Sequence, residues 1–517
     1  MAQPWRRSNV KKAIIFLIAV IVISSVAWAS ETTRSNIERV EEGLLPSLLV
    51  ANGPRWSIEE RMAHYKVPGV SIAVIKDFEL QWAKGYGVVD ANTNHPVTER
   101  TLFQAASISK PIAATVALHL VQKGILDLDS DVNEKFESWK VPENEFTRNE
   151  KVTLRRLLSH TAGLTVSGFP GYGEGEPVPT ILEVLNGRKP SNTPPIRVDT
   201  EPGTRFKYSG GGYTVLQLLV EDVTGAPFSE TARELIFEPL GMAHSSFQKP
   251  LPQTLAPLVS SAHSREGKPF KGHWYLSEGS VCCGLWTTPT DLVKYAIEIQ
   301  KSLRGESNKI LSADMVKKML TTSGLGDAGL GLFLYSRDGD IYFQHGGGNA
   351  GFRCYLIAHR DEGYGAAIMT NADNGSNLMP EILRSIAKEY EWKNYLPEEY
   401  ESYDAVVEVH RKKAMESPDD PDVSEGNLNR IGYELLAMEA YKQSIALFIL
   451  NTALYPKSAN CYDSLAEAYW KSGDTENAII HFREALEIFE QYPEINKRYE
   501  HLKERIPKIL EQLEGNE

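Results

Sequence analysis

The distribution of strand-like segments constrains the fold of this 517-residue sequence more than any other feature. Two apolar segments near the N-terminus, Val70–Ile75 and Leu80–Gly87, flank a turn at Lys76 and Asp77, which predicts a hairpin. Strand-like segments return between residues 341 and 370, after a long stretch of helix signals and Gly/Pro-rich loops. One sheet built from both ends of a domain, with a helical insert between them, explains this order. The sequence therefore predicts an α+β domain whose early and late segments meet in space.

The composition is that of an acidic globular protein. Hydrophobic residues make up 42% and charged residues 24% of the chain, and the formal net charge is −13. This acidic balance, without a basic patch that contains aromatic residues, argues against a nucleic-acid partner. The four cysteines are too few for a disulfide framework. Because the adjacent pair Cys282 and Cys283 could close only a strained bridge, we expect free, buried thiols.

The first 29 residues have the order of a secretory signal. The apolar run Ala13–Ile23 leads to a cleavage site at Ala27-Trp28-Ala29 and is preceded by four cations, Arg6, Arg7, Lys11 and Lys12. An uncleaved membrane anchor formed by residues 13–29 is the alternative, because this run is about long enough to span a bilayer. In both cases the positively charged segment before the apolar run stays on the cytoplasmic side of the membrane. We therefore expect the rest of the chain to be exported, to the periplasm or the extracellular space.

A serine and a lysine are spaced for nucleophilic catalysis in Phe103–Ile112, which reads FQAASISKPI. Ser107 precedes Lys110 by three residues at the start of a predicted helix, so both side chains lie on one helical face. A lysine whose pKa is lowered by burial or by neighbouring cations can accept the seryl proton, and the helix N-terminus favours negative charge on the oxygen. The alternative is an N-cap serine followed by a solvated lysine. The S-x-x-K pattern recurs without this context at Ser8, Ser246 and Ser385.

Two later segments supply further polar groups. Tyr208-Ser209-Gly210 lies in a loop that follows Pro202 and Gly203. His345 is followed by three glycines at the end of a predicted strand, where a substrate backbone can lie against the strand edge. Each residue alone has a structural explanation, because a half-buried tyrosine can pack a loop and a histidine can simply end a strand.

Three short motifs occur in a fixed order: Ser107-Ile108-Ser109-Lys110, Tyr208-Ser209-Gly210 and His345-Gly346-Gly347. Together with LLSHTAGL at residues 157–164, they resemble the serine β-lactamase and penicillin-binding protein superfamily. The resemblance covers about residues 55–392 and favours the branch of class C β-lactamases, D-alanyl-D-alanine peptidases and related esterases. It implies an antiparallel sheet flanked by helices, with a helical insert domain.

The resemblance also implies a role for each site residue. Ser107 would be the acylated nucleophile, Lys110 would take its proton, and Tyr208 would relay the proton to the leaving group. His345 would either hydrogen-bond Tyr208 or hold a substrate carboxylate. The backbone N–H groups of Ser107 and Gly348 would form the oxyanion hole. Substrate would bind along the strand edge made by His345, Gly346, Gly347 and Gly348.

Three features depart from the family pattern or compete with it. Gly210 stands where the family commonly has the asparagine of Y-x-N, and the missing amide weakens the β-lactamase interpretation. Cys282-Cys283-Gly284 replaces a turn of small residues. His160 invites a Ser-His-Asp triad, but we interpret it as a histidine that holds a loop, because Lys110 already supplies a base. The sequence carries no recognisable metal-binding motif, and we expect no cofactor.

A second module follows the first. Residues 400–421 are charged and turn-rich, as in a linker. Beyond them a 34-residue register of small and aromatic residues resembles the tetratricopeptide pattern of paired helices, with a generic helical hairpin as the alternative and a capping helix at 493–513. The predicted division is a signal or anchor at 1–29, a connector at 30–54, the hydrolase-like domain at 55–395, a linker at 396–425 and all-α repeats at 426–517.

These features predict an exported serine hydrolase that forms an acyl-enzyme on an amide, lactam or ester carbonyl. The leading substrates are the D-alanyl peptide of peptidoglycan and a β-lactam that mimics it. Two alternatives remain open. One is an esterase of small esters, and the other is a penicillin-binding sensor or scaffold whose repeats recruit a protein partner.

Overall fold

The computed structural model describes residues 34–276 and 281–515. It divides into two compact units. The first comprises the described residues up to Leu44 together with Trp56–Tyr395, and the second comprises Leu45–Arg55 together with the described residues from Leu396 onward. The predicted signal or anchor at residues 1–29 lies outside the described residues. Among the helices that are described, none is both long and apolar enough to cross a membrane.

A six-stranded antiparallel sheet forms the centre of the first unit, in the order β3-β2-β9-β8-β7-β6. β2 from the start of the domain pairs with β9 from its end, with Val70 opposite Thr370. This pairing confirms the predicted sheet, although the sequence did not predict β6. The strands are β2 (Gly69–Lys76), β3 (Glu79–Gly87), β6 (Phe333–Arg337), β7 (Asp340–Asn349), β8 (Phe352–His359) and β9 (Gly365–Thr370).

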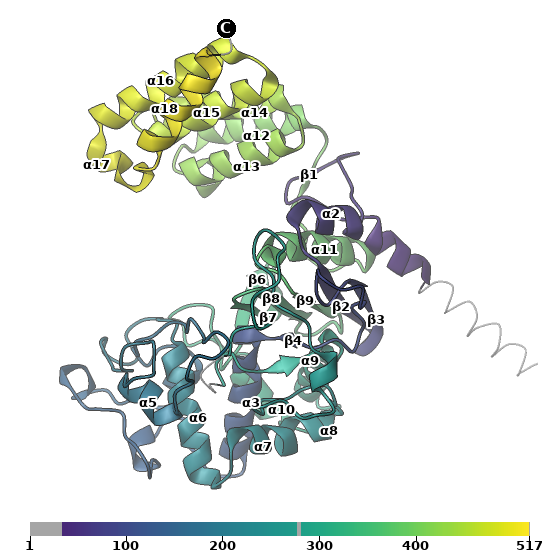
Figure 1. Ribbon diagram of the computed structural model, residues 1–517, viewed down its shortest axis with the longest axis vertical. Helices are drawn as coiled ribbons and strands as arrows, with labels where there is room; N and C mark the ends of the chain where they lie inside the picture. Colours follow the sequence, from purple (N-terminus) through teal and green to yellow (C-terminus); the bar gives the residue numbers. More distant parts are fainter. Residues whose placement is uncertain (1–33, 277–280, 516–517) are drawn as a thin grey trace, which may run out of the picture. The chain divides into compact units, whose positions relative to one another are not determined.

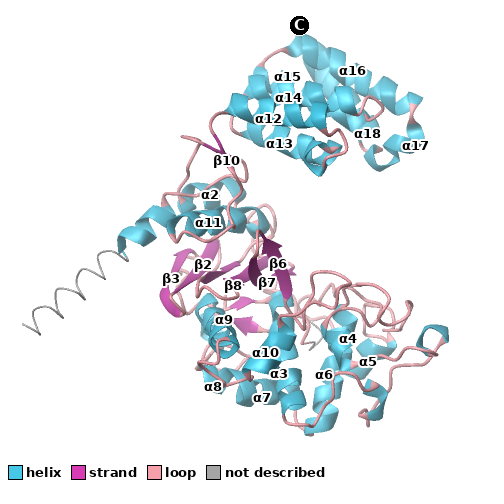
Figure 2. Cartoon of the chain, turned by 180° about the vertical axis from the view of Figure 1, so that it is seen from behind, coloured by secondary structure: helices cyan, strands magenta, loops and turns pink. Residues whose placement is uncertain are grey.

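Helices cover both faces of this sheet (Figures 1 and 2). Helix α11 (Gly375–Glu389) lies on one face beside α2 (Ile58–Tyr65), and α9 (Pro289–Leu303) packs on the other face against β2 and β9. Buried residues of α11 recur at helical spacing, so one side of the helix faces the sheet. The ion pair between Arg61 and Glu381, 2.6 Å long and largely buried, joins α2 to α11.

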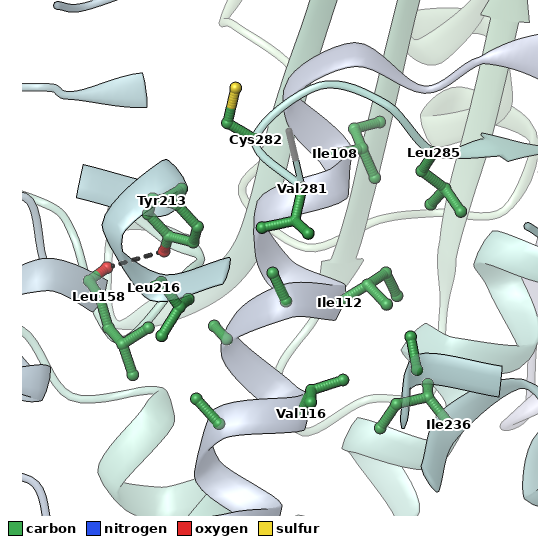
Figure 3. Packing of buried hydrophobic residues seen from close by; sticks show 14 of the residues in the cluster. Ile108, Ile112, Val116, Leu158, Tyr213, Leu216, Ile236, Val281, Cys282 and Leu285 are labelled. Atoms are coloured by element: carbon green, nitrogen blue, oxygen red, sulfur yellow. Dashed lines mark hydrogen bonds between the residues drawn. The ribbon is translucent and has the colours of Figure 1, made fainter. Parts of the chain in front are cut away.

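The predicted helical insert lies between β3 and β6 and is arranged around α3 (Ser109–Gln122). Most of α3 is buried, and Ile112 and Val116 lie among apolar side chains of neighbouring helices (Figure 3). A helix that is apolar on most sides is a core helix. The other helices of this region are α4 (Leu154–Leu158), α5 (Ile181–Asn186), α6 (Gly210–Thr224), α7 (Phe228–Ala232), α8 (Glu238–Leu240) and α10 (Ala313–Met319).

Two short strands hold the chain immediately before α3. β4 (Phe103–Gln104) pairs with β5 (Trp286–Thr287) in antiparallel fashion. The ladder continues through Ala105, whose N–H donates to the Leu285 carbonyl at 2.8 Å. The segment that contains Ser107 is therefore fixed against residues 285–287, far away in the sequence.

The second unit is almost entirely helical. A short parallel pairing of β1 (Leu49–Val50) with β10 (Glu399–Tyr400) precedes the helices. Consecutive helices then pack in pairs, α13 with α14 and α15 with α16. The helices are α12 (Tyr403–Glu416), α13 (Glu425–Ala437), α14 (Tyr441–Leu454), α15 (Ala459–Ser472), α16 (Thr475–Gln491), α17 (Pro493–Asn496) and α18 (Leu502–Glu514).

Two parts of the predicted division need correction here. Residues 403–416, placed by the sequence in a linker, form α12, because Val406 and Ala414 join an apolar cluster with α13 and α14. Part of the predicted connector belongs to the same cluster, which includes Leu48 and Val50. Small residues do permit close helix packing, as at Gly432, where a methyl group would overlap the Phe448 ring. Whether the pairs are tetratricopeptide repeats remains a prediction.

Candidate active site

Ser107 and Lys110 are in direct contact at the start of α3. Ser107 is half-buried in a single 3-10 turn, Ala106–Ile108, that leads into the helix. Lys110 is 2% exposed, and its Nζ donates to Ser107 Oγ at 3.0 Å and to the carbonyl oxygen of Cys282 at 2.9 Å. The structure thus brings together the two residues that the spacing predicted. The Cys282 carbonyl is a partner that sequence analysis missed.

The backbone beside Ser107 is strained. Ala106 has a φ of +46°, in the left-handed region that a residue with a side chain rarely adopts. Such strain persists only where the surroundings hold the chain in place. The β4–β5 ladder does so on one side, and the Cys354 thiol donates to the Ala105 carbonyl at 2.8 Å on the other. The strained turn leaves the Ser107 side chain partly accessible at the protein surface.

Tyr208 approaches Lys110 from the N-terminus of α6. Lys110 Nζ lies 4.9 Å from the centre of the half-buried Tyr208 ring. The loop is held by His160, which accepts the N–H of Lys207 at its carbonyl (2.7 Å) and the N–H of Ser209 at Nδ1 (3.1 Å). The imidazole also packs against the Tyr208 ring, with centroids 4.2 Å apart. These contacts confirm that His160 holds the Tyr208 loop, and it makes no triad with Ser107.

Lys110 is charged in the resting site, contrary to the expectation from burial alone. Burial acts to lower the pKa of Lys110, but the negative charge that Cys282 and Tyr208 can carry outweighs it, and the pKa of Lys110 lies above its ordinary value. The condition under which Lys110 itself could accept the seryl proton, a lowered pKa, is therefore not met. Lys110 places an ammonium against Ser107 Oγ, where it stabilises negative charge on nearby oxygens.

The two adjacent cysteines are free thiols, as predicted. Both side chains are buried, and their sulfur atoms lie 3.3 Å apart, well beyond a covalent bond. The hydrogen bond to Cys282 and burial raise the pKa of Cys283 far above its ordinary value, so Cys283 is a neutral thiol. Figure 3 shows Val281 and Cys282 beside the first turns of α3.

The end of β7 presents a strand edge beside the Ser107 segment. β6 pairs with β7 only as far as Phe333 opposite Gln344, so residues 345–349 have β8 as their strand partner within the described sheet. At Gly347 a methyl group would overlap the Ala105 carbonyl oxygen and the Cys354 sulfur. Only glycine allows β7 to approach the Ser107 segment this closely. The predicted edge at Gly346, Gly347 and Gly348 is thus present and adjoins Ser107.

His345 is buried and neutral. Its Nδ1 lies 2.7 Å from the Gly346 carbonyl oxygen, which can only accept, so Nδ1 carries the proton. Burial and the nearby Lys110 cation lower the pKa of His345 to about 3. The buried Nε2 is then an acceptor, and within the described structure it has no hydrogen-bond partner. A neutral acceptor cannot hold a substrate carboxylate by charge, so a hydrogen-bond donor is the fitting partner for Nε2.

The predicted oxyanion hole lies where β7 meets the nucleophile segment. Asn349, next to Gly348, donates from Nδ2 to the Gln104 side-chain oxygen (2.6 Å) and to the Cys283 carbonyl (3.2 Å). These bonds fix the end of β7 to β4 and to the 282–284 turn. The use of the Ser107 and Gly348 N–H groups as the donor pair stays a prediction.

The space beside Gly210 is filled by an aromatic ring. A Cβ at Gly210 would lie 3.0 Å from Phe169 Cε2 and 3.1 Å from the Ser167 carbonyl oxygen. The Gly210 N–H donates to that same carbonyl at 3.2 Å. A side chain at position 210 would start in tight contact with the Phe169 ring, and with glycine here the family's amide is absent. Sequence analysis missed Phe169, because a phenylalanine in a Gly/Pro-rich loop carries no signal of its neighbours.

Comparison with known proteins agrees with this geometry. The chain is 28% identical over 344 residues to penicillin-binding protein 4 of Amycolatopsis lactamdurans, covering 64% of this chain and 87% of that protein. It is 25% identical to protein flp of Staphylococcus aureus, strain N315, of which it covers 64%. In structure it resembles the octameric penicillin-binding protein homologue from Pyrococcus abyssi, with a TM-score of 0.55 and 27% identity over 69% of this chain and 80% of that one.

The family assignment rests on a match across the first unit. The superfamily that the three motifs resemble is confirmed, and its members are serine hydrolases, which sets the general class of this protein. The matched segment spans residues 57–390 and holds every site residue described above. The chain belongs to the Beta-lactamase family.

Proposed function

We propose that this protein is a serine hydrolase that transfers the acyl group of an ester, amide or lactam to Ser107 and then to water. One observation carries the proposal: the buried Lys110 ammonium donates to Ser107 Oγ at 3.0 Å, with the Tyr208 ring beside it. A solvated lysine after an N-cap serine, the alternative for this motif, would be exposed. The N-terminal signal pattern further supports an exported enzyme.

The charge of Lys110 decides which group takes the seryl proton. An ammonium cannot accept it, but it stabilises a phenolate on Tyr208, which then acts as the base. As the proton moves to Tyr208, Ser107 Oγ bonds to the carbonyl carbon. The N–H groups of Ser107 and Gly348 stabilise the negative carbonyl oxygen. When the tetrahedral intermediate collapses, the bond to the leaving group breaks and the leaving group receives the proton from Tyr208. Water hydrolyses the acyl-enzyme by the same route.

Two features favour esters over lactams as substrates. Gly210 lacks the amide that in the family helps to seat a lactam or peptide side chain, and the Phe169 ring lies against the position where a side chain would start. His345 is neutral and offers an acceptor rather than a cation, so it does not attract the carboxylate of a penicillin or of a D-alanyl peptide. Neither feature weakens the binding of an uncharged ester.

Covalent labelling tests the nucleophile. A fluorescent penicillin or a p-nitrophenyl ester should add one acyl group to the intact protein, read by mass spectrometry, and Ser107→Ala should abolish the addition. Ser385→Ala is the matched control, because Ser385 begins another S-x-x-K but is buried in α11, where it donates to the Val40 carbonyl. Labelling that persists in Ser107→Ala would remove the nucleophile assignment. Faster turnover of a chromogenic cephalosporin than of the ester would reverse the proposed substrate order.

A further inference from the structure

An apolar cavity of about 250 Å³ lies beside the nucleophile segment. Two indole rings form part of its wall: Trp274 and Trp286 meet edge to face, with ring centroids 5.1 Å apart. Aliphatic side chains, among them Leu251 and Val259, supply most of the rest. We call this space the Trp cavity.

Hydrogen bonds join the Trp cavity to the predicted oxyanion hole. Gln104, which lines the cavity and precedes Ser107 by three residues, accepts from Asn349 Nδ2 at 2.6 Å and donates to the Tyr275 carbonyl at 2.9 Å. Asn349 is the residue after Gly348. Gly284, also in the lining, belongs to the turn whose Cys282 carbonyl holds Lys110. The cavity wall and the catalytic groups therefore share one backbone framework.

The chemistry of the lining selects an apolar ligand group. The Gln104 oxygen and one of its N–H groups are already bonded. Lys249, the charged residue among the described lining residues, is exposed to solvent. Leu276, which lines the cavity, is 40% exposed, and an exposed large apolar side chain at a cavity is typical of a binding site. A cavity of about 150 Å³ holds benzene, so this one has room for a phenyl or branched alkyl group.

We propose that the Trp cavity binds an apolar, aryl-sized substituent of the substrate next to the reacting carbonyl. This inference rests on the proposed acyl transfer and narrows its substrates to hydrophobic acyl compounds. Burial of such a substituent would keep the scissile carbonyl at Ser107 in a site that lacks the family's amide at position 210.

Two series of esters test the proposal and locate the substituent. The first compares p-nitrophenyl acetate with p-nitrophenyl phenylacetate, which varies the acyl group. The second compares methyl acetate with benzyl acetate, which varies the leaving group. In one of the two series the protein should favour the aryl compound at least tenfold in kcat/KM. Val259→Trp, which fills the cavity, should reduce that ratio to near one, and Trp274→Ala, which enlarges it, should shift the preference toward bulkier groups.

The control and a binding measurement separate failure of this proposal from failure of the proposed function. Leu182→Trp adds an indole at a residue that is 39% exposed on α5, outside the lining, and should leave both ratios unchanged. In Ser107→Ala, p-nitrophenyl phenylacetate should quench indole fluorescence more strongly than in the same background with Val259→Trp. Loss of this quenching in the Val259→Trp variant would support binding of the aryl group in the Trp cavity, even if no ester is hydrolysed. Folded Val259→Trp and Trp274→Ala variants that keep the wild-type ratios and quenching would overturn the proposal.

Discussion

Two buried histidines near Ser107 and Lys110 are neutral at physiological pH. Burial, followed by the nearby Lys110 cation, lowers the pKa of His160 well below 6.5, and burial with Lys110 lowers the pKa of His345 to about 3. In the unfolded chain a histidine titrates near 6.5. Between these values the unfolded state binds more protons than the folded state, so the free energy of unfolding rises with pH in this range.

The protein should therefore lose stability on acidification below about pH 6.5. For His345 alone the free energy of unfolding should fall by about 2 kcal/mol between pH 7.5 and 5, since one pKa unit corresponds to about 1.4 kcal/mol. Denaturant titrations at both pH values measure the change. His345→Asn keeps an N–H near the Gly346 carbonyl but does not titrate, so its stability should depend less steeply on pH. An unchanged slope in that variant would show that His345 is not buried in neutral form.

Residue types and spacing predicted part of the site and could not predict the rest. Ser107 and Lys110 were found because an i, i+3 pair at a helix start fixes their separation locally. The second partner of Lys110 is a backbone carbonyl 172 residues away, and a carbonyl carries no mark in the sequence. Phe169 is a similar case, because the residue that fills the space beside Gly210 is set by the path of a loop.

At the level of elements, β7 positions the site through one close approach. Gly347 faces the Ala105 carbonyl and the Cys354 sulfur, whereas a Cβ at Gly346 would meet only the Tyr355 ring at 3.5 Å, an ordinary contact. The sequence predicted a strand at 341–344 followed by glycines. It predicted a substrate-binding edge at those glycines but not their regular pairing with β8 as far as Asn349, because glycine is unfavourable in a strand. Tertiary contact with the nucleophile segment explains the extension.

Gly347→Ala should force β7 away from the nucleophile segment. We expect a loss of about 1–3 kcal/mol in the free energy of unfolding, as for other overpacked sites, and at least a tenfold loss in ester kcat/KM. Gly346→Ala is the matched control for stability, and its free energy of unfolding should stay within about 0.5 kcal/mol of wild type. Chemical denaturation of both variants gives the comparison. Equal stability of the two would mean that β7 does not depend on this approach.

At the level of the whole molecule, the chain passes between the two units three times. Residues 45–55 leave the first unit and return to it, and their ends are joined by hydrogen bonds between the backbones of Leu44 and Trp56 (2.9 and 3.3 Å). A sequence scan assigns a domain as one continuous segment, so it placed 30–54 in a single connector. The pairing of β1 with β10 depends on residues about 350 positions apart and has no local signal.

Removal of the second unit should therefore have one outcome when residues 45–55 are kept and another when they are replaced. Truncation after Tyr395 leaves Leu48, Leu49 and Val50 without the helices and the strand that bury them. We expect this protein to stay folded and to keep its hydrolase activity but to self-associate, because an apolar strand with an open edge is a template for pairing. Replacing residues 45–55 with a short polar turn in the same truncation should restore a monomer, since Leu44 and Trp56 are already adjacent.

Size-exclusion chromatography with light scattering, combined with ester turnover, distinguishes these outcomes. The full chain with the same loop replacement is the control. It should keep wild-type turnover and lose stability only in the helical unit, because β10 and the apolar cluster around Val406 and Leu428 would lose their contacts with β1. If the simple truncation is as monodisperse as the loop-replaced one, residues 45–55 are not held by the second unit. If both truncations unfold, the first unit requires the helices for its own stability.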